Sequence, residues 1–276
     1  LGIVGGGQLG RMTAMAAAQL GFHAHIYTPQ PGSPAAEVAG AVTVASYEDS
    51  EALARFAASV DTITVEFEHI PEVAAHQLDQ SGCFYPAASL IATCADRVRE
   101  KAFIEASGVR PAPYGVARSA RECQDVVTRL GGGPCIAKQT RFGYDGKGQR
   151  PIKEPQQARA AWEELGGGGV VLVEAVVPFR LEASILIARD RMGQTACFPV
   201  TENHHRDGIL RESRVPARLP AQAAAGMQAL AEAMAAEAGL VGLLAIECFV
   251  MDDGSLYVNE MAPRPHNSGH WTQDGC

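Results

Sequence analysis

Short apolar runs alternate with amphipathic stretches near the start of the chain. The runs at residues 1–4, 23–27, 41–45 and 61–67 have the length and β-branched content of buried strands. The stretches QLGRMTAMAAAQL and YEDSEALARFAAS repeat apolar residues at helical spacing. Strands that alternate with helices predict a parallel sheet covered by helices, and therefore an α/β fold.

The pattern changes beyond this region. Residues 84–109 read as helical, and the RPAP that follows has the composition of a boundary. Further strands are predicted at residues 135–138, 149–153, 170–176, 180–188, 240–251 and 255–264, with helices at 154–165 and about 220–237. We therefore expect two domains, with the break between them in residues 90–115.

Composition narrows the functional classes. The 276 residues are 47% hydrophobic and 20% charged, as in a globular protein, and the net charge of −8 gives no attraction to nucleic acid or an anionic membrane. No apolar run is long enough to span a bilayer. The seven cysteines form no C-x-x-C pair, which indicates neither a disulfide framework nor a zinc site and favours the cytoplasm.

The glycines of GGGQLG at residues 5–10 match a dinucleotide-binding fingerprint. That fold also needs an acidic residue for the ribose, or an arginine for a 2′-phosphate, near the end of the second strand. No acid occurs between this motif and Glu37, and no arginine occurs between Arg11 and Arg55. The sequence thus disfavours a nicotinamide enzyme and leaves either a tight turn whose amides face an anion or a turn without a ligand.

A glycine-rich loop follows the strand that ends at Lys138. In KQTRFGYDGKGQ, three glycines and several cations suit a loop that covers a polyphosphate, with charge from Lys138 and Lys147. The G-K-[ST] ending of a P-loop is absent. By itself, the loop would favour an ordinary flexible hairpin turn.

Two glutamates are predicted to oppose each other across a hairpin. If Asp253 and Gly254 are the central residues of a two-residue turn, Glu247 faces Glu260. Opposed carboxylates in apolar strands repel, so we expect a divalent cation between them, with Asn259 as a further oxygen ligand. Oxygen ligands favour Mg²⁺ over zinc. The alternative is a pair of solvated glutamates on an edge strand.

The stretch APRPHNSGHW, beyond these strands, is rich in hydrogen-bond donors. Arg264, His266, Asn267 and Ser268 suit the binding of a small planar anion or of a developing phosphate.

Together, these motifs resemble the ATP-grasp superfamily. Lys138 before GYDGKGQ, Glu247 and Asn259-Glu260 on paired strands, and PHNSGHWT carry the resemblance. Within the superfamily, the opening GGGQLGRM, VEFEHIP and ENHHRDGIL are similar to the 5-(carboxyamino)imidazole ribonucleotide synthetases. The resemblance covers essentially the whole chain.

The resemblance implies an ATP-dependent ligase of de novo purine (IMP) biosynthesis. It would join bicarbonate to the amine of 5-aminoimidazole ribonucleotide through carboxyphosphate and release ADP and phosphate. It implies ATP with Mg²⁺ or Mn²⁺, and no NAD, flavin or biotin. Its partners would be these small molecules, without nucleic acid or membrane, and a second copy in a homodimer.

The resemblance also assigns site residues. The ATP-binding residues would be Arg97, Lys138, Gly143, Tyr144, Asp145, Gly146, Lys147, Gly148, Gln149, Glu174, Ala175, Val176, Val177, Glu182, His205, Asn259 and Glu260. The residues placed at the reacting groups would be Tyr144, Asp145, Arg264 and His266, and those that bind the aminoimidazole ribonucleotide or bicarbonate would be Gln8, Leu9, Glu66, Glu68, Asn267 and Ser268. The metal ligands would be Glu247, Glu260 and Asn259.

Domain boundaries follow from the same resemblance. Residues 1–95 would form a Rossmann-like substrate domain, and residues 96–276 the ATP-grasp domain, with a small ATP-lid subdomain at about 112–175. The family continues into a third domain, so we expect this sequence to be a fragment.

Two enzyme alternatives are another ATP-grasp ligase, such as formate-dependent glycinamide ribonucleotide transformylase, and an NAD(P) oxidoreductase. A non-catalytic nucleotide-binding module is the alternative of a different class.

Overall fold

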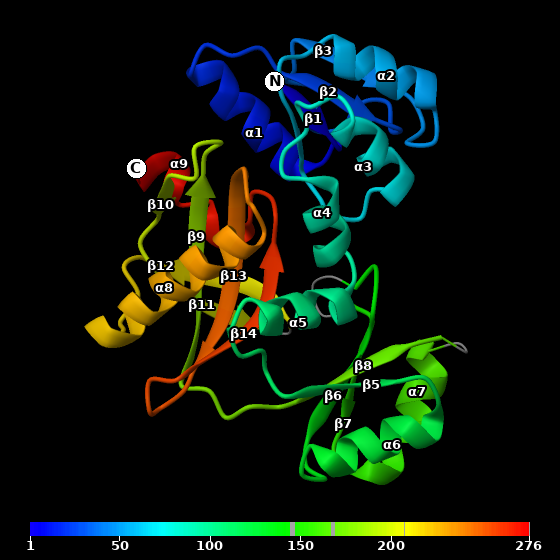
Figure 1. Ribbon diagram of the computed structural model, residues 1–276, viewed down its shortest axis with the longest axis vertical. Helices are drawn as coiled ribbons and strands as arrows, with labels where there is room; N and C mark the ends of the chain where they lie inside the picture. Colours follow the sequence, from blue (N-terminus) through cyan, green and yellow to red (C-terminus); the bar gives the residue numbers. More distant parts are fainter. Residues whose placement is uncertain (144–146, 167–168, 207, 276) are drawn as a thin grey trace.

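The computed structural model describes residues 1–143, 147–166, 169–206 and 208–275. Figure 1 shows three sheets, each with its own helices. The α/β class predicted from the sequence is confirmed, and two of the three sheets are antiparallel. No helix in the described ranges has both the length and the apolar composition to cross a bilayer.

The first sheet is parallel and has the strand order β3-β2-β1-β4. Its strands are β1 (Gly2–Val4), β2 (His25–Thr28), β3 (Ala41–Val44) and β4 (Ile63–Val65). The helices α1 (Gln8–Gln19), α2 (Ser50–Ala58) and α3 (Glu72–Asp79) accompany it. The parallel sheet confirms the prediction from the alternating pattern, whereas α3 was not predicted.

The helical stretch that follows is divided into two helices, α4 (Ala88–Cys94) and α5 (Arg97–Ala106). Asp96 causes the division, because its carboxylate accepts hydrogen bonds from the N–H groups of Val98 and Arg99 and so begins a new helix. The cap fixes where α5 starts, and Arg97 is its first residue. From the start of α5, the Arg97 side chain donates hydrogen bonds to Glu260 and to the backbone oxygen of Gly143.

A small antiparallel sheet has the order β5-β8-β6-β7. It consists of β5 (Tyr114–Ala117), β6 (Cys135–Gln139), β7 (Gln149–Ile152) and β8 (Val171–Ala175). The helices α6 (Ala120–Arg129) and α7 (Ala158–Gly166), the latter preceded by the short η1 (Pro155–Gln157), pack on it around a separate apolar core. The strands β6, β7 and β8 match predicted segments, whereas β5 and α6 were not predicted.

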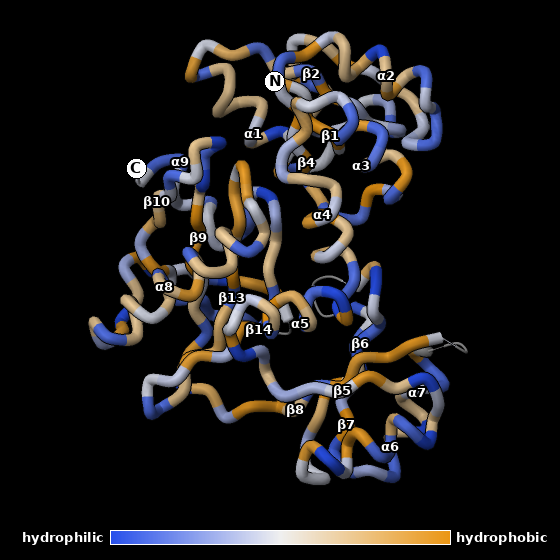
Figure 2. The backbone as a smooth tube through the Cα atoms, in the orientation of Figure 1, coloured by the Kyte–Doolittle hydropathy of each residue, from blue (hydrophilic) through white to orange (hydrophobic). Residues whose placement is uncertain are grey.

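The large sheet has the order β12-β11-β9-β13-β14, and β10 pairs with β9. Its strands are β9 (Leu181–Arg189), β10 (Thr195–Cys197), β11 (Thr201–Arg206), β12 (Ile209–Arg214), β13 (Gly242–Val250) and β14 (Leu256–Ala262). The helix α8 (Ala221–Glu237) packs on it, and the described chain ends with η2 (Asn267–Gly269) and α9 (Thr272–Gly275). Figure 2 shows hydrophobic segments along its strands, where the largest apolar core lies.

Candidate active site

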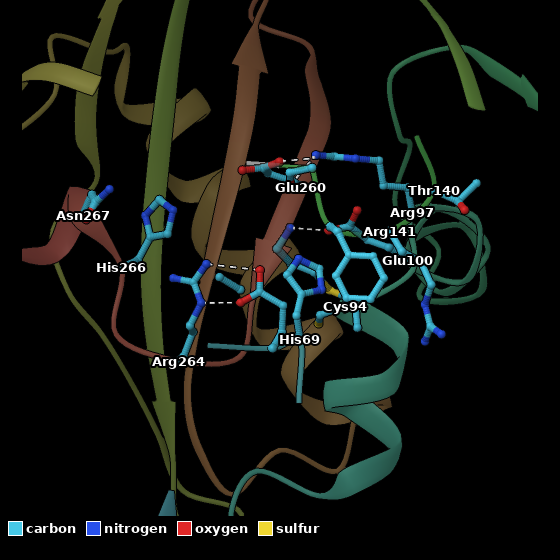
Figure 3. A pocket seen from close by; sticks show the side chains of 16 residues that line it. His69, Cys94, Arg97, Glu100, Thr140, Arg141, Glu260, Arg264, His266 and Asn267 are labelled. Atoms are coloured by element: carbon cyan, nitrogen blue, oxygen red, sulfur yellow. Dashed lines mark hydrogen bonds and ion pairs between the residues drawn. The ribbon is translucent and has the colours of Figure 1, made fainter. Parts of the chain in front are cut away.

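Two adjoining cavities lie where the three sheets meet. The larger, about 390 Å³, lies between the small and large sheets; among the residues that line it are Arg97, Lys138, Gln149, Glu182, His205, Glu247, Asn259 and Glu260. The smaller, about 120 Å³, includes Glu68, Glu100, Gly143 and Arg264 in its lining (Figure 3). Arg97, Glu260, His266 and Asn267 line both cavities. The predicted nucleotide site and the predicted substrate residues Glu68 and Asn267 are therefore neighbours, whereas the predicted substrate residue Ser268 lines neither cavity.

Some predicted site residues lie elsewhere. Gln8 and Leu9, in the first turn of α1, and Glu66 are not among the described residues that line either cavity. The segment over residues 175–177 follows β8 and is also absent from both linings. Tyr144, Asp145 and Gly146 lie outside the described residues.

The predicted pairing of Glu247 with Glu260 is confirmed, although the predicted turn is wrong. Val250 pairs with Leu256, and the N–H of Met251 donates to the carbonyl oxygen of Ser255, so the three residues 252–254 form the turn instead of the predicted two. A β-bulge between Glu247 and Cys248 shifts the register by one residue and leaves Asn259 as the extra residue of β14. The bulge compensates for the longer turn, and the two glutamates still face each other.

Charge and burial affect the two glutamates differently. Burial, reinforced by the charge of Glu260, raises the pKa of Glu247 to about 8. Burial would also raise the pKa of Glu260, but Arg97 and Lys138 outweigh this effect and lower it. The Nη1 of Arg97 lies 3.4 Å from Oε2 of Glu260. Neighbouring positive charge therefore stabilises the ionised form of Glu260, whereas the ionised form of Glu247 is disfavoured.

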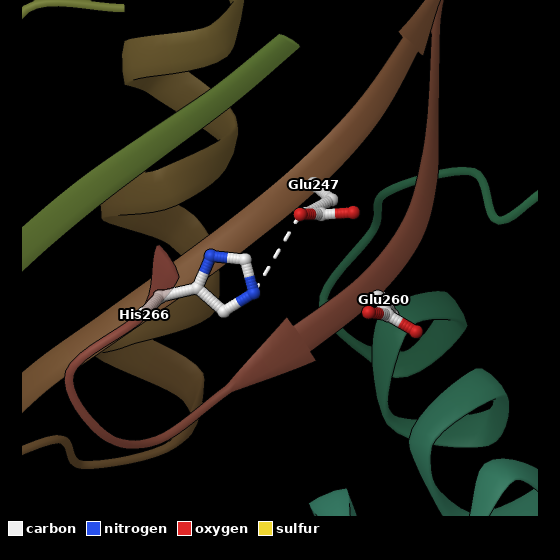
Figure 4. Close-up of side chains that lie close together, drawn as sticks. All are labelled: Glu247, Glu260 and His266. Atoms are coloured by element: carbon white, nitrogen blue, oxygen red, sulfur yellow. Dashed lines mark ion pairs between the residues drawn. The ribbon is translucent and has the colours of Figure 1, made fainter. Parts of the chain in front are cut away.

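His266 joins the two glutamates. One atom of each of the three side chains lies within 4.8 Å of the others, an arrangement able to hold a metal ion (Figure 4). Its Nε2 is 3.6 Å from Oε1 of Glu247, and its Nδ1 is 2.9 Å from the hydroxyl of Ser268. Burial and the nearby Arg264 lower the pKa of His266 to about 4, so its imidazole is neutral at pH 7. The sequence placed His266 with the substrate and did not predict its contact with Glu247.

A chain of buried charges lies beneath the larger cavity. The Glu174 carboxylate pairs with Lys138 through one oxygen and with Lys101 through the other. Burial opposes ionisation of Glu174, but Lys138 and Lys101 outweigh it and lower its pKa to about 2. From the family resemblance, we expected Glu174 to lie on the strand edge that contacts adenine. The sequence did not predict a role for Lys101.

A signal for Lys101 was present in the helical spacing. Arg97, Glu100, Lys101 and Ile104 occupy the i, i+3, i+4 and i+7 positions of one helix face, and the last three are buried. Charged residues on a core-facing stripe are uncommon without partners. This stripe therefore pointed to an internal charge cluster.

Two more polar pairs position predicted site residues. The Nδ1 of His205 lies 2.5 Å from Oε2 of Glu182, and this hydrogen bond raises the pKa of His205. Arg264 forms a two-pronged ion pair with Glu68, in which Nη2 donates to Oε1 over 3.2 Å (Figure 3). Burial would raise the pKa of Glu68, but Arg264 lowers it. The second pair connects the segment after β4 with the loop after β14.

The glycine-rich turn binds an anion that belongs to the protein itself. The carboxylate of Glu66 accepts hydrogen bonds from the N–H groups of Gly7 and Gly10, the latter over 2.7 Å. Amides at the start of a helix attract negative charge, and here a side chain supplies it. The predicted tight turn with amides that face an anion is therefore present, and for Gly7 and Gly10 the anion is the carboxylate of Glu66.

Comparisons with known proteins agree with this arrangement. The ribonucleotide synthetase preATP-grasp domain matches residues 1–95, and the ATP-grasp domain matches residues 102–276. The N5-carboxyaminoimidazole ribonucleotide synthase of Brucella melitensis is 43% identical over 280 residues, which cover 100% of this chain and 76% of that protein.

Solved structures agree as well. The ADP complex of PurK, an N5-carboxyaminoimidazole ribonucleotide synthetase, has a TM-score of 0.93 and 39% identity and covers 100% of this chain and 72% of its own. The Aspergillus clavatus synthase in complex with ADP and 5-aminoimidazole ribonucleotide has a TM-score of 0.88 and 25% identity, with 100% and 72% coverage. This chain therefore belongs to the ATP-grasp family and, within it, to the N5-carboxyaminoimidazole ribonucleotide synthases.

Proposed function

We propose that this protein carboxylates 5-aminoimidazole ribonucleotide with bicarbonate at the expense of ATP, as an ATP-grasp ligase of purine biosynthesis. The observation that carries the proposal is the junction of two cavities at Arg97, Glu260, His266 and Asn267. A phosphate donor in the larger cavity and an acceptor in the smaller one would meet there. The relatives described above support the choice of substrates.

The larger cavity suits ATP. Lys138 and Arg97 offer positive charge to the phosphates, and phosphoryl transfer depends mainly on such positioning and charge stabilisation. Glu182 and His205, joined by their hydrogen bond, line the same cavity and would bind the ribose side of the nucleotide. The predicted loop residues Gln149 and Gly143 line the larger and the smaller cavity, respectively.

The donor set fits a divalent cation that accompanies ATP. Glu247 and Glu260 oppose each other, and the buried Oδ1 of Asn259 has no hydrogen-bond partner among the described residues. Oxygen donors of this kind favour Mg²⁺, and the neighbouring imidazole of His266 would also suit Mn²⁺. When bound, the cation would supply charge neutralisation at the phosphate oxygens.

The smaller cavity suits the carboxylation step. A bicarbonate oxygen would attack the γ-phosphorus, and the bond to the β-phosphate oxygen would break to give carboxyphosphate and ADP. The amine of the ribonucleotide would then take the carboxyl carbon, lose a proton and release phosphate. Arg264, held by Glu68, and the neutral imidazole of His266 would orient the anion and its acceptor.

We propose that the chain is divided into two domains. Residues 1–95 would form the substrate domain, and residues 96–276 the ATP-grasp domain, with residues of about 112–175 as its lid. The separate parallel sheet and the separate small sheet support this division. We also propose a cytoplasmic homodimer, on the family resemblance alone.

Measurement of ADP release tests the proposal against its alternatives. The purified protein is given MgATP and 5-aminoimidazole ribonucleotide, with and without bicarbonate. The proposal requires ADP release that depends on both. Release that is independent of bicarbonate, or that requires formate and glycinamide ribonucleotide, would reject it.

A further inference from the structure

Lys101 is a fully buried cation directly beneath the larger cavity. Its side chain is 1% exposed, and its Nζ lies 2.6 Å from Oε1 of Glu174. The same Nζ donates a hydrogen bond of 2.6 Å to the backbone oxygen of Asn259. The other oxygen of Glu174 pairs with Nζ of Lys138. One carboxylate on β8 therefore bridges a lysine on α5 and a lysine on β6.

The charges in this cluster do not balance. Glu174 is 6% exposed and Lys138 is 8% exposed, so water screens these interactions poorly. Within this triad, two ammonium groups and one carboxylate leave a surplus of one positive charge, and the neighbouring Arg97 and Glu260 add one charge of each sign. Lys138 lines the larger cavity, whereas Lys101 and Glu174 do not. The surplus charge is thus presented to the cavity through Lys138.

We propose that Lys101 is a positioning residue for the phosphate site. By pairing with Glu174 from the side away from the cavity, it prevents that carboxylate from neutralising Lys138. The ammonium group of Lys138 then keeps the charge that it offers to a nucleotide phosphate. The inference rests on the proposed function only in assuming that a polyphosphate binds in this cavity.

The second contact of Lys101 connects the phosphate site to the carboxylate pair. Asn259 is the bulged residue of β14 and immediately precedes Glu260. A hydrogen bond from a charged donor to its carbonyl oxygen stabilises this irregular backbone more than a neutral one would. Lys101 therefore connects β8 of the small sheet with β14 of the large sheet.

A variant pair separates the effect on charge from a purely structural effect. Lys101→Met leaves Glu174 with Lys138 as its only partner in the triad and cancels the surplus charge. Lys101→Met combined with Glu174→Gln removes one charge of each sign and restores the surplus at Lys138. Lys153→Met is the matched control, because Lys153 is exposed and lies outside the cavity linings.

The readout is the dissociation constant of MgADP for the intact protein, measured by calorimetry. We expect Lys101→Met to weaken binding by about tenfold or more, as for the loss of one buried charge at an anion site. The double variant should recover to within about threefold of the wild type, and the control should stay within about twofold. A role limited to holding elements together gives no reason for a second substitution in the same cluster to restore affinity.

Three results would overturn the inference. These are wild-type affinity in a folded Lys101→Met variant, a double variant no better than the single one, and a double variant that does not fold. The last would show that the cluster maintains the fold rather than the charge of Lys138. If only Lys101→Met fails to fold, the double variant decides the matter. Because MgADP binding requires neither bicarbonate nor aminoimidazole ribonucleotide, a failure of the proposed carboxylation would be seen separately.

Discussion

At the residue scale, the carboxylate of Glu66 lies against the backbone of the glycine-rich turn. A Cβ added to Gly7 would approach Oε1 of Glu66 to 2.8 Å, and one added to Gly10 would lie 3.0 Å from Oε2. Glycine at these positions lets the carboxylate reach the amides. The motif has the spacing of a dinucleotide fingerprint because both arrangements need a tight turn with accessible N–H groups.

Replacement of Glu66 by alanine tests this role. Alanine would leave the N–H groups of Gly7 and Gly10 without their acceptor, and we expect the free energy of unfolding to fall by about 1.5–3 kcal/mol. Glu66→Gln, which keeps one acceptor oxygen, should lose less. Urea denaturation measures the difference. An unchanged urea midpoint for the alanine variant would show that the carboxylate does not hold the turn.

Glu100 makes stability depend on pH. Burial raises its pKa to about 7, and its carboxyl accepts a hydrogen bond of 2.7 Å from the N–H of Met261. A carboxyl whose pKa is raised on folding contributes most below its unfolded pKa, and the contribution is lost as pH rises through the folded pKa. Between pH 5 and 7, the wild type should therefore lose about 1–3 kcal/mol of stability relative to Glu100→Gln. Parallel pH profiles for the two proteins would contradict this assignment.

At the scale of elements, the β13–β14 hairpin shows how an incorrect turn gave a correct pairing. Met251 donates to the carbonyl oxygen of Ser255, so the turn is one residue longer than expected. The bulge at Asn259 restores the register at Glu260. A bulge has no simple sequence signature, so the pairing could be predicted but this geometry could not.

The opposed glutamates of the β13–β14 hairpin predict that ADP release depends on a divalent metal ion. Glu247→Gln and Glu260→Gln should each raise the Mg²⁺ concentration needed for half-maximal ADP release by about 100-fold or abolish release, because each removes a charged ligand. Asp252→Asn, at the exposed tip of the same hairpin, is the control and should match the wild type. Direct Mn²⁺ binding provides a second readout. Wild-type metal dependence in both glutamine variants would reject the site.

Some elements were not predicted because their apolar pattern is weak or short. The strands β11 and β12 read TENHHR and ILRESR, and their polar side chains include His205, which lines the larger cavity. Strands with this function lack the apolar alternation that identifies a strand. The helix α6 buries only Cys123, Val126 and Val127, so its apolar stripe is short.

At the scale of the whole molecule, the site depends on contacts between segments far apart in the sequence. Glu68 follows the first sheet, and Arg264 follows the last strand of the large sheet. Residue patterns identified the separate groups, and the family resemblance predicted that they act together. The partners Lys101 for Glu174, Glu66 for the turn and Glu68 for Arg264 required the folded chain.

The ion pair between Glu68 and Arg264 should affect the acceptor substrate and not the nucleotide. Glu68→Gln removes the charge that holds Arg264, and we expect kcat/KM for 5-aminoimidazole ribonucleotide to fall by about 10- to 100-fold. The dissociation constant of MgADP should change by less than about twofold, because Glu68 lines only the smaller cavity. Glu37→Gln, which breaks an exposed pair with Arg11, is the control. Equal losses for nucleotide and acceptor would contradict this division of the site.

The transfer of label from bicarbonate is the most direct test of the proposed carboxylation. The protein is incubated with MgATP, 5-aminoimidazole ribonucleotide and ¹³C,¹⁸O-bicarbonate, and the products are followed by mass spectrometry and NMR at early times. Transfer through carboxyphosphate should give one ¹³C-carboxyl on the exocyclic amine for each ADP formed, together with one ¹⁸O in the released phosphate. ADP formation without ¹³C in the ribonucleotide, or phosphate free of ¹⁸O, would contradict it.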